Sequence, residues 1–266
     1  MLMALEYLGS VGVGVTSPQL FRANDGKVYV VKLQNNCMGP KVLVNEYVAS
    51  WFGTYMGLCF PPSGLIEIDQ QVLQEKRRFR RRVIKPGPHF ASQYLHRNRY
   101  VTRHDLQKAS NKTAMAGIIL FDHMFHNIDR TKNRKNLLVC HEDAVYMLYA
   151  IDNSHLFVRG RWNAESLEKL AGKITINHWR TYGWLLKHFL ERSDFIPYAT
   201  KVKSLGQHKL AALVQSIPEE WLPKSKEREA LLSYMNTRCL MVDEIVSKLC
   251  QSIPDINGCT HFNQRK

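Results

Sequence analysis

The stretch from His126 to Phe157 constrains the fold of this chain more than any other part of the sequence. It begins with a polar loop that contains Asp129, continues into an apolar run directly after Asn136, and returns through a second apolar run to Asp152. Two short apolar runs separated by polar residues predict a β-hairpin. The strands that we expect are Leu137–Cys140 and Tyr146–Ile151. One carboxylate then precedes the first strand and another follows the second.

This order of polar residues is typical of the catalytic loop of kinase-like enzymes. In such a loop, Asp129 would approach the attacking hydroxyl group, while Asn136 and Asp152 would hold metal ions on the nucleotide phosphates. Carboxylate and amide oxygens are hard ligands that suit Mg²⁺. The competing interpretation is an Asx-rich turn before a hairpin, but the coincidence of loop, strand and second aspartate favours chemistry.

The metal-binding asparagine has two candidates. Protein kinases place this residue where the present sequence has Arg134, and Asn133 and Asn136 lie on either side of that position. We favour Asn136, because it directly precedes the apolar strand as the metal-binding asparagine usually does. His155, just after Asp152, either contacts phosphate or caps a turn, and the sequence leaves both interpretations open.

A strand-borne lysine is the next candidate. Lys32 ends the β-branched run Val28–Lys32, and the turn signal Asn24–Gly26 precedes that run. A lysine that faces a cleft can pair with nucleotide phosphates, and kinase-like folds orient it with a helix-borne glutamate, here Glu46. Each residue alone is more typical of the surface. Together they indicate a nucleotide site.

The segment from Gly9 to Pro18 has glycines at short intervals. Gly12 and Gly14 would let backbone N–H groups approach a phosphate closely, and Ser10 and Thr16 would donate hydrogen bonds to it. The segment lacks the Gly-Lys-Ser/Thr of a Walker A motif. A flexible N-terminal turn is the competing interpretation.

The rest of the sequence predicts an α+β fold of two lobes. Most of the chain before residue 90 is rich in β-branched and aromatic runs, whereas the apolar residues after about Trp162 recur at helical spacing. Further expected elements are a helix at Pro40–Met56, a strand at Leu65–Leu73 and a buried helix at Ala109–Phe125. We expect a small β-rich N-terminal lobe at residues 1–90 and a larger helical C-terminal lobe at 91–266, with a cleft between them.

The net charge indicates an anionic partner. It is +14, and the densest basic run is Arg77–Arg82. Basic residues interleaved with an aromatic suit nucleic acid or an acidic surface, although alternate arginines of a strand would form a solvated face instead. Nucleic-acid binding stays open but is not favoured.

Cysteine spacing and apolar runs indicate the compartment that we expect. The six cysteines have no zinc-ligand spacing, no signal peptide is evident, and no apolar run approaches the ~18 residues of a membrane span. We expect free thiols in a cytoplasmic protein without a membrane span.

As a set, these motifs resemble the HipA-like kinase family, especially its compact stand-alone bacterial type. The resemblance covers most of residues 5–250 and rests on Tyr29–Lys32, Asn45–Glu46, Gly87–Phe90, Asn127–Thr131, Asn136–Leu138 and Ile151–Ser154. It implies a two-lobed protein-kinase-like fold, ATP with Mg²⁺, and phosphoryl transfer to a hydroxyl group. It also implies phosphate contact by Lys32, catalysis by Asp129, and metal binding by Asn136 and Asp152.

The function that we expect is that of an ATP-dependent Ser/Thr protein kinase with a protein substrate. One alternative is a kinase of small molecules such as antibiotics, sugars or lipids. The other is a basic nucleotide-binding pseudokinase or adaptor that holds an anionic partner at Arg77–Arg82. Hydrolases have no positive support, because neither a Gly-x-Ser-x-Gly nor a His-Glu-x-x-His motif occurs.

Overall fold

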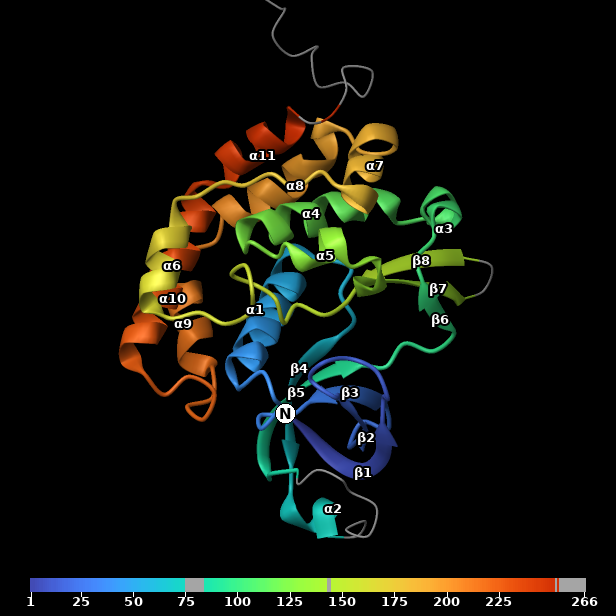
Figure 1. Ribbon diagram of the computed structural model, residues 1–266, viewed down its shortest axis with the longest axis vertical. Helices are drawn as coiled ribbons and strands as arrows, with labels where there is room; N and C mark the ends of the chain where they lie inside the picture. Colours follow the sequence, from blue (N-terminus) through green and yellow to red (C-terminus); the bar gives the residue numbers. More distant parts are fainter. Residues whose placement is uncertain (75–83, 143–144, 252, 254–266) are drawn as a thin grey trace, which may run out of the picture.

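The computed structural model describes residues 1–74, 84–142, 145–251 and 253. Figure 1 shows a β-barrel at one end, a group of helices at the other, and a small sheet beside the helices. This arrangement confirms the α+β class. The basic run Arg77–Arg82 lies outside the described residues. Within the described part of the chain, every helix is too short or too polar to cross a membrane.

Five strands close the barrel in the order β1-β2-β3-β5-β4. They are β1 (Leu2–Ser10), β2 (Gln19–Ala23), β3 (Val28–Lys32), β4 (Ser63–Ile68) and β5 (Gly87–Gln93). Alternate residues point inward, as Tyr29 and Val31 do on β3, and they form the barrel core with Phe21 and Ile66. Gly26, with a φ of 79°, completes the expected turn between β2 and β3.

Helix α1 (Lys41–Met56) lies between the barrel and the remaining helices (Figure 1). It ends at Gly57, whose φ of 73° lets its N–H bond to the carbonyl of Gly53. Val48 and Phe52 are fully buried in the large core that also contains the helices after residue 103. Although α1 lies among the barrel strands in the sequence, it packs with the helical part. The lobe boundary at residue 90 stays a prediction.

The strand expected at Leu65–Leu73 is shorter than predicted. Strand β4 ends at Ile68, and the short helix α2 (Gln70–Gln74) follows. The carboxylate of Asp69 accepts a hydrogen bond of 2.8 Å from the backbone N–H of Gln71, which turns the chain away from the sheet.

The helix expected at Ala109–Phe125 is present only from Met115 onward. It is α4 (Met115–Met124), after α3 (Arg103–Lys108) and the 3₁₀ turn η2 (Lys112–Ala114). Asn111 explains the difference, because its side chain donates to the carbonyl of Leu148 at 3.0 Å and accepts from the N–H of Leu148 at 2.8 Å. The asparagine thereby pairs with a strand and holds the preceding residues outside the helix.

The expected hairpin forms part of a sheet in the order β6-β7-β8. The strands are β6 (Asn98–Tyr100), β7 (Leu137–Glu142) and β8 (Val145–Ala150), and the one-turn helices α5 (Asp129–Lys132) and η3 (Arg134–Asn136) precede β7. The expected helical remainder consists of α6 (Ala164–Ala171), α7 (Arg180–His188), α8 (Arg192–Lys203), α9 (Gln207–Ser216), α10 (Ser225–Leu240) and α11 (Val242–Cys250).

A buried arginine fixes the end of α4, from which the loop containing Asp129 departs. Arg238 of α10 donates to the carbonyls of His123 at 3.0 Å and Met124 at 2.9 Å. These carbonyls at the helix end have no partner within the helix, so a cationic donor there satisfies hydrogen bonding and charge together.

Candidate active site

Three charged side chains from distant parts of the sequence meet where the barrel faces the helical part. Lys32, at the end of β3, donates to the carboxylate of Glu46 on α1 and, at 2.8 Å, to the Oδ1 atom of Asp152 after β8. The side chains of Lys32 and Glu46 are 12% and 4% exposed, whereas that of Asp152 is 37% exposed. The expected lysine–glutamate ion pair is therefore present, and Asp152 joins it from the open side.

The charges of this group support one another. Burial by itself lowers the pKa of Lys32, but Asp152 and Glu46 outweigh burial and hold the pKa above its ordinary value. Burial raises the pKa of Asp152, yet Lys32 and hydrogen bonds from Ser154 bring that pKa well below its usual range. Lys32 and Asp152 therefore both carry their charges at neutral pH.

A left-handed residue places this group. Asp152 has a φ of 59°, which is uncommon for a residue other than glycine and turns the chain sharply after β8. The turn directs the backbone N–H of Asn153 to Glu46 at 3.0 Å and that of Ser154 back to Asp152 at 3.3 Å. Glu46 is thus hydrogen-bonded to the segment that carries Asp152. This bond connects α1 to the end of the hairpin.

Asp129 and Asn136 form a second polar pair. Asn136, which is buried, donates from Nδ2 to the Oδ2 atom of Asp129 at 2.7 Å, and its Oδ1 atom accepts from Asn133 at 3.1 Å. The two asparagines considered for metal binding are therefore hydrogen-bonded to each other. The side chain of Asn136 bonds to the carboxylate of Asp129, whereas Asn133 donates its backbone N–H to the carbonyl of Asp129 at 2.7 Å.

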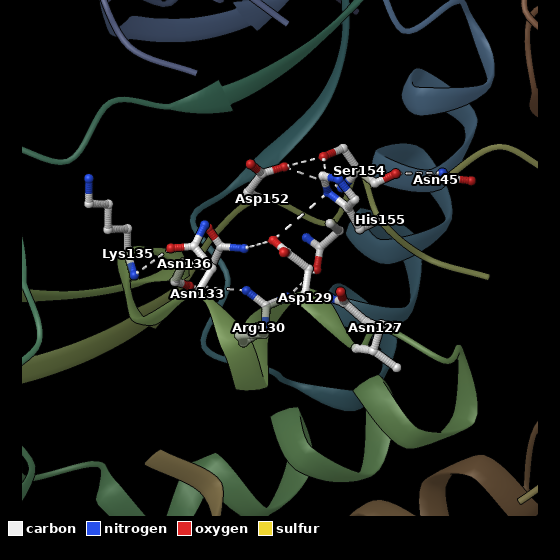
Figure 2. A network of polar contacts seen from close by, with 12 residues as sticks. Asn45, Asn127, Asp129, Arg130, Asn133, Lys135, Asn136, Asp152, Ser154 and His155 are labelled. Atoms are coloured by element: carbon white, nitrogen blue, oxygen red, sulfur yellow. Dashed lines mark hydrogen bonds and ion pairs between the residues drawn. The ribbon is translucent and has the colours of Figure 1, made fainter. Parts of the chain in front are cut away.

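Ser154 and His155 connect the two aspartates (Figure 2). The hydroxyl of Ser154 donates to Asp152, and it lies 3.2 Å from Nδ1 of His155. That same nitrogen is 3.9 Å from the Oδ2 atom of Asp129. Figure 2 shows Asp129, Asn136 and Asp152 gathered in one region. The structure thus brings together the three residues that the sequence marked at the two ends of the hairpin.

Arg130 has a role that the sequence did not reveal. Although it directly follows Asp129, its side chain is fully buried and pairs with Asp122 of α4 at 2.8 Å. Its remaining nitrogens donate to the carbonyls of Asn136 and Ile151 and to the side chain of Asn153. Arg130 therefore hydrogen-bonds to both ends of the hairpin, to Asn136 before β7 and to Ile151 after β8.

Asp122 completes this support. Its carboxylate also accepts hydrogen bonds from the hydroxyl of Tyr182 on α7 and, at 3.0 Å, from the side-chain amide of Asn127. Asp122 lies within an apolar helix in the sequence, and a charged residue in such a run is rarely buried without a partner. An aspartate within an apolar helix could therefore have indicated a buried ion pair, although the sequence does not identify Arg130 as the partner.

A cavity of about 690 Å³ lies between the barrel and the hairpin. Lys32, Glu46, Asn136 and Asp152 line it, as do Asn133 and Lys135 from the catalytic loop. Its volume falls in the range of small-molecule sites, and its walls mix apolar side chains with a few converging polar groups. Asp129 is absent from the lining and lies beside it through Asn136.

The glycine-spaced segment covers one side of this cavity. Gly14 and Thr16 line it, whereas Ser10 and Gly12 are outside the lining and contact each other at 3.1 Å. Gly12 and Gly14 have φ values of 79° and 98°, conformations that glycine adopts at little cost. A phosphate role for Ser10 and Gly12 stays a prediction.

The donor set fits a nucleotide with a magnesium ion. One amide and one carboxylate, those of Asn136 and Asp152, face the same cavity, and Mg²⁺ is commonly bound by one or two protein oxygens together with substrate phosphates. Among the described residues, no group of three or more His, Cys, Asp or Glu side chains could hold a metal ion. A metal ion held by Asn136 and Asp152 would take its other ligands from the nucleotide phosphates and water.

A β-barrel, a helical part and a cavity bordered by a lysine–glutamate pair define the two-part protein-kinase-like fold. The crystal structure of the Helicobacter pylori proinflammatory kinase CtkA has this fold, with a TM-score of 0.58 over 92% of the present chain and 96% of that chain. The two sequences are 12% identical. The similarity confirms the predicted fold class.

The family follows from the sequence. The model of the HipA-like kinase family matches residues 5–250, so the chain belongs to that family, as the motifs predicted. Membership implies phosphotransferase activity and use of ATP. No curated protein matches the chain.

Proposed function

We propose that this chain transfers the γ-phosphoryl group of ATP, with Mg²⁺, to a serine or threonine hydroxyl of a protein. The observation that carries the proposal is the convergence of Lys32, Asn136 and Asp152 on one cavity, with Asp129 hydrogen-bonded at its edge. Each of these residues has the chemical type that phosphoryl transfer needs at that place.

Lys32 and Asp152 prepare the cavity for a triphosphate. The ammonium group of Lys32 has three protons, and Glu46 and Asp152 accept two of them, which leaves one donor for a phosphate oxygen. Asp152 and Asn136 would hold a magnesium ion through their side-chain oxygens. Bound Mg·ATP supplies an electrophilic phosphorus atom whose developing charge is spread over the metal and phosphate oxygens.

Asp129 orients the nucleophile. Its carboxylate is 26% exposed and accepts a hydrogen bond from Asn136, so one oxygen is held while the other can accept a hydrogen bond from the acceptor hydroxyl. As the hydroxyl oxygen forms its bond to the γ-phosphorus, the bond from that phosphorus to the bridging oxygen breaks and ADP leaves, while the hydroxyl proton passes to Asp129. Asp129 lies at the edge of the nucleotide cavity and is partly exposed, so the acceptor hydroxyl reaches it from solvent.

The test compares Asp129→Asn with the wild-type chain. Incubation with γ-labelled ATP and a cell lysate separates labelled protein from labelled metabolites. We expect protein labelling to fall about 10²- to 10⁴-fold in the variant, the usual contribution of a positioned general base. Equal thermal unfolding temperatures would establish that the fold is intact. Wild-type turnover by Asp129→Asn contradicts the assignment, and labelling of metabolites alone moves it to a small-molecule kinase.

A further inference from the structure

A second cavity, of about 490 Å³, lies beside the catalytic loop and shares no lining residue with the nucleotide cavity. We call it the arginine pocket. Its polar lining consists of Arg103 of α3, Arg134 of η3, Arg180 of α7, and the threonines Thr102 and Thr181. Figure 1 shows α3 and α7 at the same end of the helical part, next to the β6-β7-β8 sheet.

The pocket carries positive charge that no carboxylate in its described lining neutralises. No Asp or Glu lines it within the described residues. The nearest acid in sequence, Asp105, is fully buried and already holds Arg99 and the hydroxyl of Thr102, the latter at 2.7 Å. Arg180 donates to the carbonyl of Lys132, which is a neutral acceptor. Arginines that line one cavity without a carboxylate in that lining can pair their guanidinium groups with an anion that enters it.

The catalytic loop separates the two cavities. Asn133, Lys135 and Asn136 line the nucleotide cavity, whereas Arg134, between them, lines the arginine pocket. The bond from Arg180 to the carbonyl of Lys132 attaches the wall of the pocket to the same loop. An anion bound there is next to the loop that presents Asp129.

The apolar part of the lining favours a peptide over nucleic acid. Val101, Leu106 and Trp184 complete the walls. Trp184 packs against Phe189 with ring centroids 4.7 Å apart and against His188 at 5.7 Å. A single-stranded nucleic acid needs aromatic faces on which its bases can stack, and this ring already stands against two protein rings.

We propose that the arginine pocket binds an anionic side chain of the peptide substrate, a carboxylate or a phosphomonoester, close to the hydroxyl that is phosphorylated. This substrate preference rests on the proposed protein-kinase function. Arginine forks match both anions through paired N–H groups, and a phosphomonoester gains more because it carries the larger charge.

The experiment uses the full chain and three series of fluorescein-labelled degenerate peptides. Each peptide has one acceptor serine and, at one fixed position near it, phosphoserine, glutamate or alanine. Fluorescence anisotropy with saturating ADP measures Kd, and transfer from labelled ATP measures kcat and KM. The variants are Arg103→Gln and Arg103→Lys, with Arg192→Gln as a control because Arg192 is exposed on α8 outside the pocket.

We expect anionic peptides to bind the wild-type chain about tenfold more tightly than the alanine series, since a charge-assisted hydrogen bond contributes roughly that much. Arg103→Gln should remove this preference, Arg103→Lys should restore part of it, and Arg192→Gln should keep it. Transfer to alanine peptides should stay unchanged in all three variants. A stronger effect of phosphoserine than of glutamate identifies the phosphomonoester as the ligand, and equal effects identify any carboxylate or phosphate.

Two results overturn the proposal. One is equal Kd for the three series in the wild-type chain. The other is a preference that survives in Arg103→Gln. Competition by an RNA oligonucleotide that is lost in Arg103→Gln, without any peptide preference, assigns the pocket to nucleic acid instead. Failure of transfer to every peptide contradicts the proposed kinase function alone, because the anisotropy measurement does not require catalysis.

Discussion

Two groups of charged side chains lie on either side of the segment that carries Asp152, and they differ in what they leave open. In the first group, the guanidinium of Arg130 donates to Asp122, to two backbone carbonyls and to the side chain of Asn153. In the second group, Lys32 donates to the carboxylates of Glu46 and Asp152 and lines the nucleotide cavity. Both groups contain buried ions, yet only the second retains a donor and an exposed carboxylate for a ligand.

The difference teaches how to tell a structural ion pair from a functional one. A buried ion pair whose hydrogen bonds are all used within the protein stabilises one conformation and cannot bind anything else. A pair with an unused donor, held in place by neighbours, is prepared for a charge that arrives with a ligand. Arg130 and Lys32 are therefore expected to respond to mutation in opposite ways: the first in stability, the second in activity.

The largest expected effect is on stability, from Arg130→Met. Removal of the guanidinium leaves Asp122 buried without its cation, and breaking a buried pair in this way costs about 3–5 kcal/mol of unfolding free energy. Urea unfolding followed by circular dichroism measures the loss. Arg192→Met, at an exposed site, should change stability by less than about 0.5 kcal/mol. Similar losses in the two variants would remove the distinction between the groups.

The next effect is on catalysis, from Lys32→Met. Loss of a preorganised donor at a developing charge lowers kcat about 10²- to 10³-fold. Steady-state transfer from labelled ATP measures it. Lys27→Met serves as the control, because Lys27 is exposed and directly precedes β3, whose last residue is Lys32. Activity close to wild type in Lys32→Met would contradict the role given to this lysine.

A smaller effect separates the two asparagines. Asn136→Ala removes an oxygen from the cavity and the hydrogen bond to Asp129. Asn133→Ala removes the hydrogen bonds of its side chain to Asn136 and to the backbone N–H of Lys135, and it leaves the carboxylate of Asp129 with its partner Asn136. We expect the Mg²⁺ concentration for half-maximal activity to rise about 10- to 100-fold in the first variant, and by less in the second. The reverse order would assign the metal to Asn133.

The smallest effect concerns a buried histidine on the barrel side. His89 accepts a hydrogen bond from the N–H of Gln34 through Nδ1, and its other nitrogen lies 2.9 Å from the carbonyl of Lys85. Burial lowers its pKa from 6.5 to about 4, so the unfolded chain binds more protons than the folded chain between these values. The stability due to neutral His89 is complete above pH 6.5 and is lost as the pH falls through 4.

This dependence has a slope of about 1 kcal/mol per pH unit between pH 4 and 6.5. Urea unfolding at a series of pH values measures it, and the variant His89→Gln should show a flatter profile than the wild type. His104→Gln, at an exposed position, should keep the wild-type slope. A wild-type slope in His89→Gln would show that this histidine does not titrate differently on folding.

Local patterns predicted much of the fold. The hairpin after Asn136, the strand that ends at Lys32 and the helix from Lys41 to Met56 all form as expected, because each has a periodicity and turn residues that agree with its final environment. The α-helix expected from Ala109 begins only at Met115, since Asn111 pairs with Leu148 of a strand that is distant in the sequence. No local pattern carries that information.

The site divides in the same way. The sequence by itself determined that Lys32, Asp129, Asn136 and Asp152 lie at the ends of apolar runs that become strands, and from this it predicted them as the residues for the proposed phosphoryl transfer. Only the tertiary structure decided what each charge meets. It placed Arg130 with Asp122 in the interior, and it collected Arg103, Arg134 and Arg180 around a cavity. The reason is physical: local sequence sets backbone geometry, but an ion's role depends on partners and solvent brought to it by folding.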